Sequence, residues 1–162
     1  GGISESTIVE LNDGRILKLI RTNYGQLWRA FSKDRGESWH MYGPAGIDAS
    51  SAPAYVERLQ SGRLALVWCR HNPEGEDSYE LRGGDNVWSA TPVSNFRGEF
   101  SISFSEDEGE SWSSPVVIAR KEKTANDKRG EISYVCEHNG SLYLFPFQLN
   151  STFFYKLFCY LH

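Results

Sequence analysis

The segment SKDRGESW at residues 32–39 returns as SEDEGESW at residues 105–112, and six of the eight positions carry the same residue in both copies. Each copy follows an alternating, aromatic-rich run that is typical of a β-strand, at residues 26–31 and 100–104. Asp and Ser side chains can hydrogen bond the backbone of a turn, and Gly tolerates a positive φ. We therefore interpret each copy as a turn that ends a strand, with the Trp side chain packed over it.

Three other segments share a second plan, in which a turn ending in glycine joins two β-rich runs. The Asp-Gly and Asn-Gly steps in two of these turns are strong hairpin signals. A hairpin followed by two more strands around the octapeptide gives a repeating unit of four antiparallel strands. The three turns are NDG at residues 12–14, QSG at 60–62 and HNG at 138–140.

The second repeating unit is longer than the first. Gly14 precedes Ser32 by 18 residues, whereas Gly62 precedes Ser105 by 43 residues. The extra length is the polar, glycine-rich stretch around residues 71–96, which we predict to be a long loop of the kind that carries function. The spacing of the first unit, applied to the third hairpin, reaches the end of the chain. We therefore expect two complete units and most of a third.

The composition narrows the class of protein. Aromatic residues make up 14% of the 162 residues and favour β-structure. A net charge of −4 gives no basic footprint for nucleic acid, and no apolar run approaches the length of a membrane span. The chain has no phosphate-binding loop, dinucleotide fingerprint or zinc-protease motif, so we expect neither a cofactor nor a metal. We expect Cys69, Cys136 and Cys159 to be buried free thiols.

Strand direction assigns the two ends of each predicted unit. Because antiparallel strands alternate in direction, the hairpin turns and the octapeptide turns lie at one end, and the long insertion lies at the other. We predict that four polar side chains from three units converge on a rim at this second end. They are Glu5 before the first strand, Arg21 at the end of the second, Arg97 before the strand that leads to Ser105, and Tyr134 at the start of the third hairpin.

The octapeptide pattern S-x-D-x-G-x-S/T-W is the Asp box, and with it the chain resembles the sialidase (BNR-repeat) β-propellers over about residues 3–147. The resemblance implies an all-β fold of the β-propeller type. The propeller has six blades in the family, and we expect this chain to hold about three of them. The tail at residues 149–162 departs from the family pattern and is left unassigned. We expect one partial propeller domain over residues 1–162, with blades at about 3–45, 50–120 and 130–162.

The resemblance also implies roles for the four rim residues. Glu5 precedes Arg21 by 16 residues, as the catalytic Glu of bacterial sialidases precedes the second of three arginines that bind the substrate carboxylate. Arg97, eight residues before Ser105, is similar to the third of these arginines. The segment around Tyr134 looks like the one that carries the catalytic nucleophile. Glu5 is then the base that activates Tyr134.

These residue types suit a sialoside, whose anomeric carbon carries a carboxylate. A neutral Tyr avoids the like-charge repulsion that a carboxylate nucleophile would meet, and sialidases are the Tyr exception among glycosidases. A tyrosine, with an ordinary pKa of about 10, needs an adjacent base. Arg21 and Arg97 would hold the substrate carboxylate through forked, charge-assisted hydrogen bonds. The resemblance therefore implies a retaining exo-sialidase whose partner is a sialylated glycan or a related acidic sugar.

Two parts of the family site have no match in the chain. The first arginine and the acid/base Asp of the family lie N-terminal to the segment matched by Glu5, and Asp48 aligns with a loop position. We therefore expect the isolated chain to be inactive on sialosides and, through open blade edges, prone to self-association. Two other functions stay open: a non-catalytic glycan-binding or scaffold propeller, and a glycosidase that acts on another acidic sugar. Linkage preference and cellular compartment are not indicated.

Overall fold

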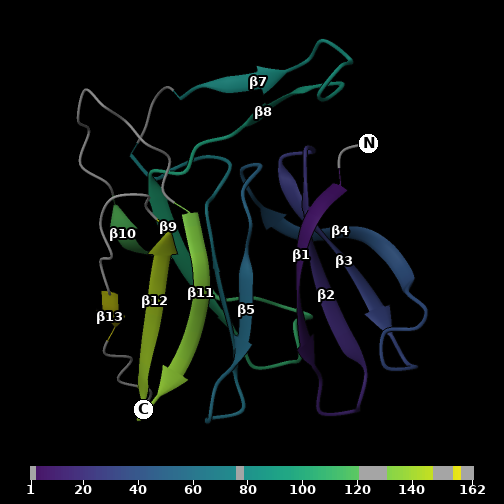
Figure 1. Cartoon of the computed structure of the whole chain (residues 1–162), viewed down its shortest axis with the longest axis vertical. Coiled ribbons are helices and arrows are strands. Elements are labelled where there is room, and N and C mark those ends of the chain that lie inside the picture. The colour runs from purple at the N-terminus through teal and green to yellow at the C-terminus, as the bar shows by residue number, and fades with distance from the viewer. Residues whose placement is uncertain (1–2, 76–78, 121–130, 148–154, 158–162) are drawn as a thin grey trace.

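A computed structural model describes residues 3–75, 79–120, 131–147 and 155–157, and all helical or strand structure in these ranges is β-strand (Figure 1). The prediction of an all-β fold is confirmed. The strands are β1 (Ile3–Glu10), β2 (Ile16–Thr22), β3 (Gln26–Ser32), β4 (His40–Asp48), β5 (Tyr55–Arg58), β6 (Leu64–Trp68), β7 (Leu81–Gly83), β8 (Pro92–Ser94), β9 (Glu99–Ser105), β10 (Val116–Arg120), β11 (Glu131–His138), β12 (Ser141–Phe147) and β13 (Tyr155–Leu157).

The strands form three larger antiparallel sheets that stand side by side (Figure 1). The first has the order β1-β2-β3-β4, the second β5-β6-β9-β10 and the third β11-β12-β13. The first strands of the sheets are neighbours, since β5 contacts β1 and also β11. The N–H of Val56 in β5, for example, donates to Thr7 Oγ1 in β1 over 3.2 Å. This radial arrangement is that of a β-propeller, and the described strands make about three of its blades.

The hairpins form at the predicted glycine turns. In the first, Leu11 N–H donates to the Arg15 carbonyl over 2.7 Å, and Gly14 N–H donates to the Leu11 carbonyl over 2.9 Å. Gly14 has a φ of 82°, a backbone conformation that glycine adopts without steric cost. The hairpin between β5 and β6 closes in the same way, with Gly62 N–H donating to the Leu59 carbonyl over 2.8 Å.

The first Asp box is a turn held by the side chains of Ser32 and Asp34. Ser32 Oγ accepts a hydrogen bond from Gly36 N–H over 2.8 Å and donates to Asp34 Oδ1 over 2.7 Å. The Asp34 carboxylate also accepts from the N–H and the hydroxyl of Ser38, over 2.9 and 2.5 Å. The bond from the Ser38 hydroxyl is the main cause that lowers the pKa of Asp34 to about 2.

We call the first, second and third sheets blade 1, blade 2 and blade 3. The second Asp box, in blade 2, repeats the contacts of the first. Ser105 Oγ bonds Gly109 N–H and Asp107 Oδ1, each over 2.8 Å, and Asp107 accepts from both polar groups of Ser111. The Ser111 hydroxyl is again the main cause that lowers the pKa of Asp107 to about 2. A Cβ on Gly109 would lie 2.7 Å from Leu17 of blade 1, so glycine here also permits close packing of two blades. The interpretation of the octapeptides as structural turns is confirmed.

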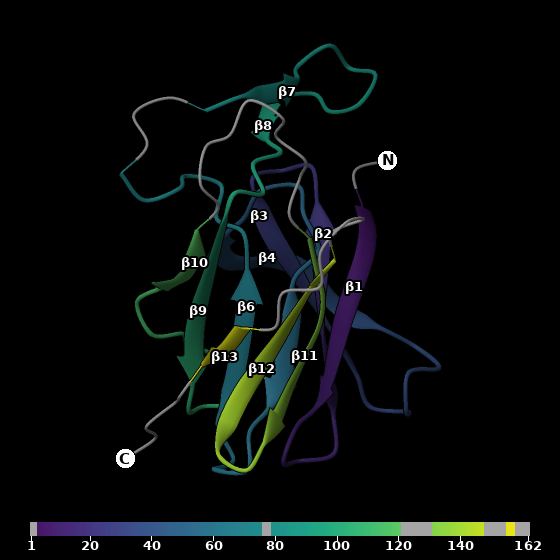
Figure 2. The ribbon, with the colours of Figure 1, turned by 60° about the vertical axis from the view of Figure 1, so that its left-hand side comes forward.

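Both Asp-box turns lie at the hairpin-turn end of their blades, which we call the box end. Ser32 of β3 pairs with Ile16, the first residue of β2, and Ser105 of β9 pairs with Leu64, the first residue of β6. The opposite end is the rim. The insertion rises beyond the rim in Figure 2. The prediction of a long loop there is wrong in one respect, because β7 and β8 pair as a short two-stranded ladder.

The second sheet is the centre of the core because the sheets on either side cover both of its faces. All five residues of β6 are buried. They alternate between two clusters: Leu64, Leu66 and Trp68 pack toward blade 1, and Ala65 and Val67 pack toward blade 3. The apolar run of β6 thus serves two blade interfaces at once.

A box residue that differs between the two copies also joins blades. Glu108 accepts hydrogen bonds from the backbone and side-chain amides of Asn12 in blade 1, both over 2.7 Å. It pairs as well with the Arg58 guanidinium, at 2.6 and 3.0 Å, and this bond is the main cause that lowers the pKa of Glu108. Arg58 in turn donates to the Glu10 carbonyl over 2.9 Å. These contacts fasten blade 2 to blade 1 at the box end.

The cysteine prediction is confirmed in part. Cys69, just after β6, is a buried free thiol, and burial raises its pKa to about 12. Cys136 is also free but only half-buried, because β11 belongs to the last of the described sheets. Cys159 lies outside the described residues.

Candidate functional site

Two of the predicted site residues line one pocket at the rim. Arg21 lies near the end of β2 in blade 1, and Arg97 precedes β9 in blade 2. Arg97 is 9% exposed, and 15% of the Arg21 side chain is exposed, so both are largely withdrawn from solvent. The pocket has a volume of about 330 Å³, at the lower end of the range usual for small-molecule sites. This rim pocket is lined by Arg21, Arg82, Gly83, Trp88, Asn95 and Arg97.

Ser51, in the connection between β4 and β5, binds both arginines. Its hydroxyl accepts a hydrogen bond from Arg21 Nε over 3.2 Å, and its carbonyl accepts one from Arg97 Nη2 over 3.3 Å. Ser51 is 1% exposed, and its hydroxyl donates to Asn23 Oδ1 over 2.6 Å. One buried residue therefore fixes the two guanidinium groups relative to each other.

The same connection fastens the insertion to blade 1. Ser51 N–H donates to the Ser94 carbonyl at the end of β8 over 2.7 Å, and Asn23 Nδ2 donates to the Trp88 carbonyl over 3.2 Å. Ser94 N–H donates to His71 Nε2 over 3.3 Å, which gives His71 a structural role. The insertion thus contacts the body of the protein through the residues that hold the arginines.

Glu5 lies beside Arg21. Its Oε2 pairs with Arg21 Nη1 at 2.7 Å and accepts a hydrogen bond from the Ser4 hydroxyl over 2.5 Å. The Ser4 bond is the main cause that lowers the pKa of Glu5, and the Arg21 cation adds to the effect. Glu5 is therefore an ionised carboxylate at neutral pH.

Tyr134 lies in β11, where its backbone pairs with Phe145 of β12. Its side chain falls outside the part of the chain that the structure describes. The predicted contact between the Tyr134 hydroxyl and the Glu5 carboxylate therefore stays a prediction.

Asp48 holds the start of the insertion. Its Oδ2 accepts hydrogen bonds from the N–H groups of His71 and Asn72, over 3.0 and 3.4 Å. Its carbonyl accepts from Trp68 Nε1 over 2.8 Å. Both polar groups of Asp48 thus serve the fold.

No local sequence pattern predicts the buried carboxylate of Glu99. Glu99, two residues after Arg97, is 1% exposed. Its two oxygens receive the guanidinium groups of Arg70 and Arg120, each at 2.9 Å, and the N–H of Glu74 lies 3.2 Å from Oε2. Arg70 and Glu74 belong to the start of the insertion, so Glu99 fastens the insertion to blade 2. Arg70, Glu74 and Arg120 lie 21 to 29 residues from Glu99, and no local pattern identifies them as its partners.

Four lining residues of the rim pocket were also missed: Arg82, Gly83, Trp88 and Asn95. All four belong to the insertion at residues 71–96. Its length and polar composition indicate a functional segment, but the two-stranded ladder that carries Arg82 into the lining of the pocket depends on pairing between β7 and β8.

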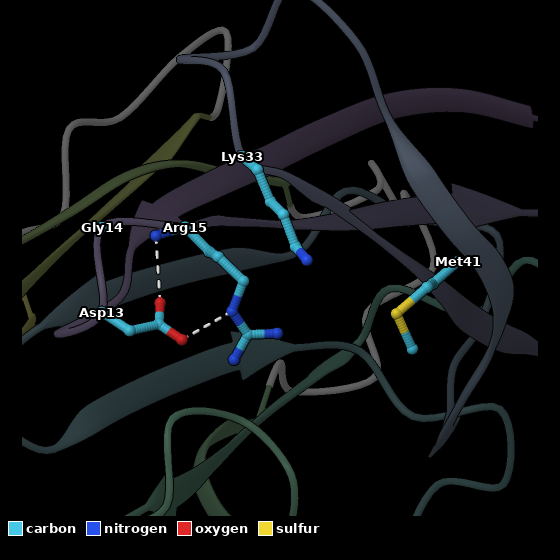
Figure 3. Close-up of a pocket in the computed structure, with 5 residues that line it drawn as sticks. All are labelled: Asp13, Gly14, Arg15, Lys33 and Met41. Carbon is cyan, nitrogen blue, oxygen red and sulfur yellow. Dashed lines mark hydrogen bonds and ion pairs between the residues drawn. The ribbon is translucent and has the colours of Figure 1, made fainter.

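A second hollow lies at the box end and is lined by Asp13, Gly14, Arg15, Lys33 and Met41 (Figure 3). The Asp13 carboxylate accepts hydrogen bonds from Arg15 N–H over 3.0 Å and from Arg15 Nε over 2.6 Å. The Arg15 guanidinium also lies over the Phe31 ring, 5.0 Å from its centroid. Asp13 and Arg15 are therefore engaged with each other in the first hairpin, and we place the candidate site at the rim.

The described residues hold no group of three or more His, Cys, Asp or Glu side chains arranged to bind a metal ion. In the same part of the chain, no helix is long and apolar enough to cross a membrane.

The repeated Asp-box turns and the radial sheets define the class to which this chain belongs. Residues 2–143 match the BNR repeat-like domain, and the chain is a member of that family. No curated protein matches the chain in sequence.

The solved structure of an arabinanase agrees with the fold. An α-L-arabinanase of Penicillium chrysogenum, solved with arabinobiose, is similar with a TM-score of 0.52 at 12% identity, over 89% of this chain and 40% of the arabinanase. The NanB sialidase of Streptococcus pneumoniae is similar with a TM-score of 0.43 at 11% identity, over 96% of this chain and 44% of the sialidase. The chain thus spans less than half of either protein. At these identities the likeness bears on the fold alone.

Proposed function

We propose that this chain is part of a sialidase-like glycosidase that removes terminal sialic acid from glycoconjugates by a retaining mechanism. The convergence of Arg21 and Arg97 on the rim pocket carries the proposal. They come from two blades and are separated by 76 residues, so a shared pocket does not follow from local structure. Membership of the BNR repeat-like family and the Glu5 carboxylate beside Arg21 support it.

The pocket chemistry suits a carboxylated sugar. A guanidinium presents donors in a rigid fork that matches a carboxylate, and such charge-assisted bonds are about twice as strong as neutral ones. Arg21 and Arg97 are largely withdrawn from solvent, in surroundings whose dielectric constant is lower than that of water. Their electrostatic attraction to a ligand carboxylate is therefore stronger than it would be in water. A neutral sugar offers no carboxylate for such forked, charge-assisted bonds, so two arginines in one pocket favour acidic ligands.

The reaction itself rests on Tyr134 and Glu5. In the proposed first step, the Tyr134 oxygen bonds the anomeric carbon while Glu5 accepts the phenol proton. The bond to the leaving sugar breaks, and the leaving oxygen takes a proton from a general acid. The family resemblance places this acid upstream of Glu5. Water then cleaves the glycosyl–tyrosine bond, so that two inversions retain the configuration. General acid help is typically worth about 10²–10⁴ in rate, so we expect this chain without that acid to be inactive.

One observation favours a second candidate, a propeller that binds glycans without cleaving them. The Glu5 carboxylate is already paired with Arg21, and its lowered pKa makes it a weaker proton acceptor. A glycosidase for another acidic sugar is a third candidate, because the two arginines recognise a carboxylate rather than a particular ring.

A fluorogenic assay on the longer parent protein tests the proposal. The parent should hydrolyse a sialoside, Tyr134→Phe should abolish turnover, and the chain alone should show none. A parent that binds sialic acid without cleaving it moves the choice to the binding propeller. Cleavage of a uronic acid glycoside in preference to the sialoside selects the third candidate. Robust turnover by the isolated 162-residue chain would show that the acid lies within it, with Asp48 the first residue to substitute.

A further inference from the structure

The insertion contributes as much of the rim pocket as the blades do. Arg82 and Gly83 come from β7, Trp88 follows them in the turn toward β8, and Asn95 follows β8. Three arginines, one asparagine, one tryptophan and one glycine therefore line the pocket. Among the described residues that line it, none is acidic.

Arg82 is a third arginine that lines the same pocket as Arg21 and Arg97. It pairs with Glu80 of its own segment, from Nε to Oε1 at 2.9 Å, and 42% of its side chain is exposed. This bond to Glu80 restrains the Arg82 guanidinium but leaves it accessible to solvent. A ligand can therefore compete with Glu80 for the Arg82 cation.

Trp88 supplies an apolar surface at a fixed place. Its side chain is half-buried, and its carbonyl accepts the hydrogen bond from Asn23 Nδ2 over 3.2 Å. Since Asn23 also accepts from the Ser51 hydroxyl, the Trp88 backbone is held by the residues that orient Arg21. An aromatic ring beside polar groups suits a sugar, which has apolar C–H faces and polar edges.

We propose that the insertion completes a binding site for one acidic monosaccharide within this chain, with Arg82 as a third arginine for the anion and Trp88 as the surface under the sugar ring. The proposal rests on the proposed function for the role of Arg21 and Arg97. It adds that ligand specificity depends on the insertion and that binding does not require residues outside the chain. The pocket volume, about 330 Å³, is consistent with a single sugar.

Calorimetric titration of the full 162-residue chain tests this inference. The probes are N-acetylneuraminic acid, its carboxyl methyl ester and arabinobiose as a neutral sugar. The acid should bind, and the ester and arabinobiose should bind at least about tenfold more weakly, since each charge-assisted bond is worth about one to two powers of ten. Arg82→Ala should weaken binding of the acid about tenfold, so that the affinity for the acid becomes closer to the affinity for the ester. Trp88→Ala should weaken acid and ester alike, by about tenfold.

Two further variants distinguish binding from a structural role. Glu80→Gln removes the competing carboxylate and should tighten binding of the acid two- to fivefold, an effect that damage to the fold cannot produce. Arg15→Ala, at the box end, is the matched control and should leave affinity unchanged.

The outcomes separate this inference from the proposed function. If Arg21→Ala and Arg97→Ala abolish binding while Arg82→Ala and Trp88→Ala do not change it, the carboxylate site stands and the role of the insertion is overturned. If the wild-type chain binds none of the probes, a complete site within the chain is overturned, and the sialoside assay on the parent then judges the proposed function separately.

Discussion

At the box end the contacts of one blade recur in the next, whereas at the rim each contact is made once. The bonds among Ser32, Asp34 and Ser38 return with nearly the same lengths in blade 2. The rim bonds of Ser51 and Glu99 have no counterpart in another described blade. Repeated contacts specify how a blade is built. At the rim, the contacts made once bring together residues from different blades, and those of Ser51 hold the two arginines of the pocket.

The repetition at the box end extends beyond the Asp box. Arg15 follows the first hairpin and lies over the Phe31 ring at 5.0 Å, and Arg63 follows the second hairpin and lies over the Phe104 ring at 4.6 Å. Such stacking adds a modest stabilisation at an exposed site. The box end is thus a structural face, and substitutions at the two ends should have different consequences.

The largest effect should come from breaking the buried charge cluster at the rim. Glu99→Ala leaves Arg70 and Arg120 without their shared carboxylate and should lower the free energy of unfolding by about 4 kcal/mol. Glu110→Ala is the matched control at the box end, because its pair with Arg29 at 3.3 Å is exposed and is worth at most about 1 kcal/mol. Urea denaturation of both variants measures the difference. Equal losses would contradict the assignment of Glu99 as the anchor of the insertion.

A second experiment compares the two Asp boxes with each other. Gly36 and Gly109 have φ of 92° and 84°, so Ala at either position is strained by about 1–2 kcal/mol. Gly109→Ala also presses on the fully buried Leu17 and should lose about 2–3 kcal/mol in total. The nearest atom to a Cβ at Gly36 is on Trp39 at 3.7 Å, an ordinary contact. If thermal unfolding shows the two variants equally destabilised, the second box does not serve the interface between blades.

Ser51→Ala probes the link between the two arginines. The substitution removes the hydroxyl that binds Arg21 and Asn23 but keeps the carbonyl that binds Arg97. We expect about tenfold weaker binding of an acidic sugar, equivalent to about 1.4 kcal/mol, with a smaller change in stability. Ser50→Ala is the control, since Ser50 Oγ is buried and has no hydrogen-bond partner among the described residues. Equal effects of the two variants on binding would argue against a positioning role for Ser51.

The smallest effect should be the pH dependence of the Asp boxes. Their aspartates have folded-state pKa values of about 2, below the ordinary value of 3.8. Because the folded pKa is the lower one, their contribution to stability is complete above about pH 4 and is lost as the pH falls toward 2. The double variant Asp34→Asn/Asp107→Asn should flatten this part of the stability curve. Denaturant midpoints measured between pH 5 and 2 test the prediction, and an unchanged slope would contradict it.

The sequence was sufficient for the features that repeat. Octapeptide spacing, glycine turns and strand alternation predict the hairpins, the Asp-box turns and their common end, because each depends on residues close together in the chain. The same alternation predicts that Arg21 and Arg97 lie at one rim. It does not predict Ser51 between them, because that contact joins a connection to two blades across 30 and 46 residues.

The insertion shows the limit of such reasoning most clearly. Its polar, glycine-rich composition predicts a loop, yet β7 pairs with β8 and brings Arg82 to the rim pocket. Pairing of two three-residue strands leaves no periodic pattern in the sequence. Likewise, Glu99 lies in an alternating strand, and nothing local indicates that two distant arginines will cover it.

The central claim is that the rim, and not the box end, recognises the carboxylate of an acidic sugar. Side-chain Nε–H resonances of arginine, followed by NMR during titration of the chain with N-acetylneuraminic acid, test it most directly. We predict that the signals of Arg21 and Arg97 shift with the acid and not with its methyl ester, while those of Arg15 and Arg63 stay unchanged. Shifts confined to Arg15 and Arg63, or equal shifts with acid and ester at the rim, would contradict the account.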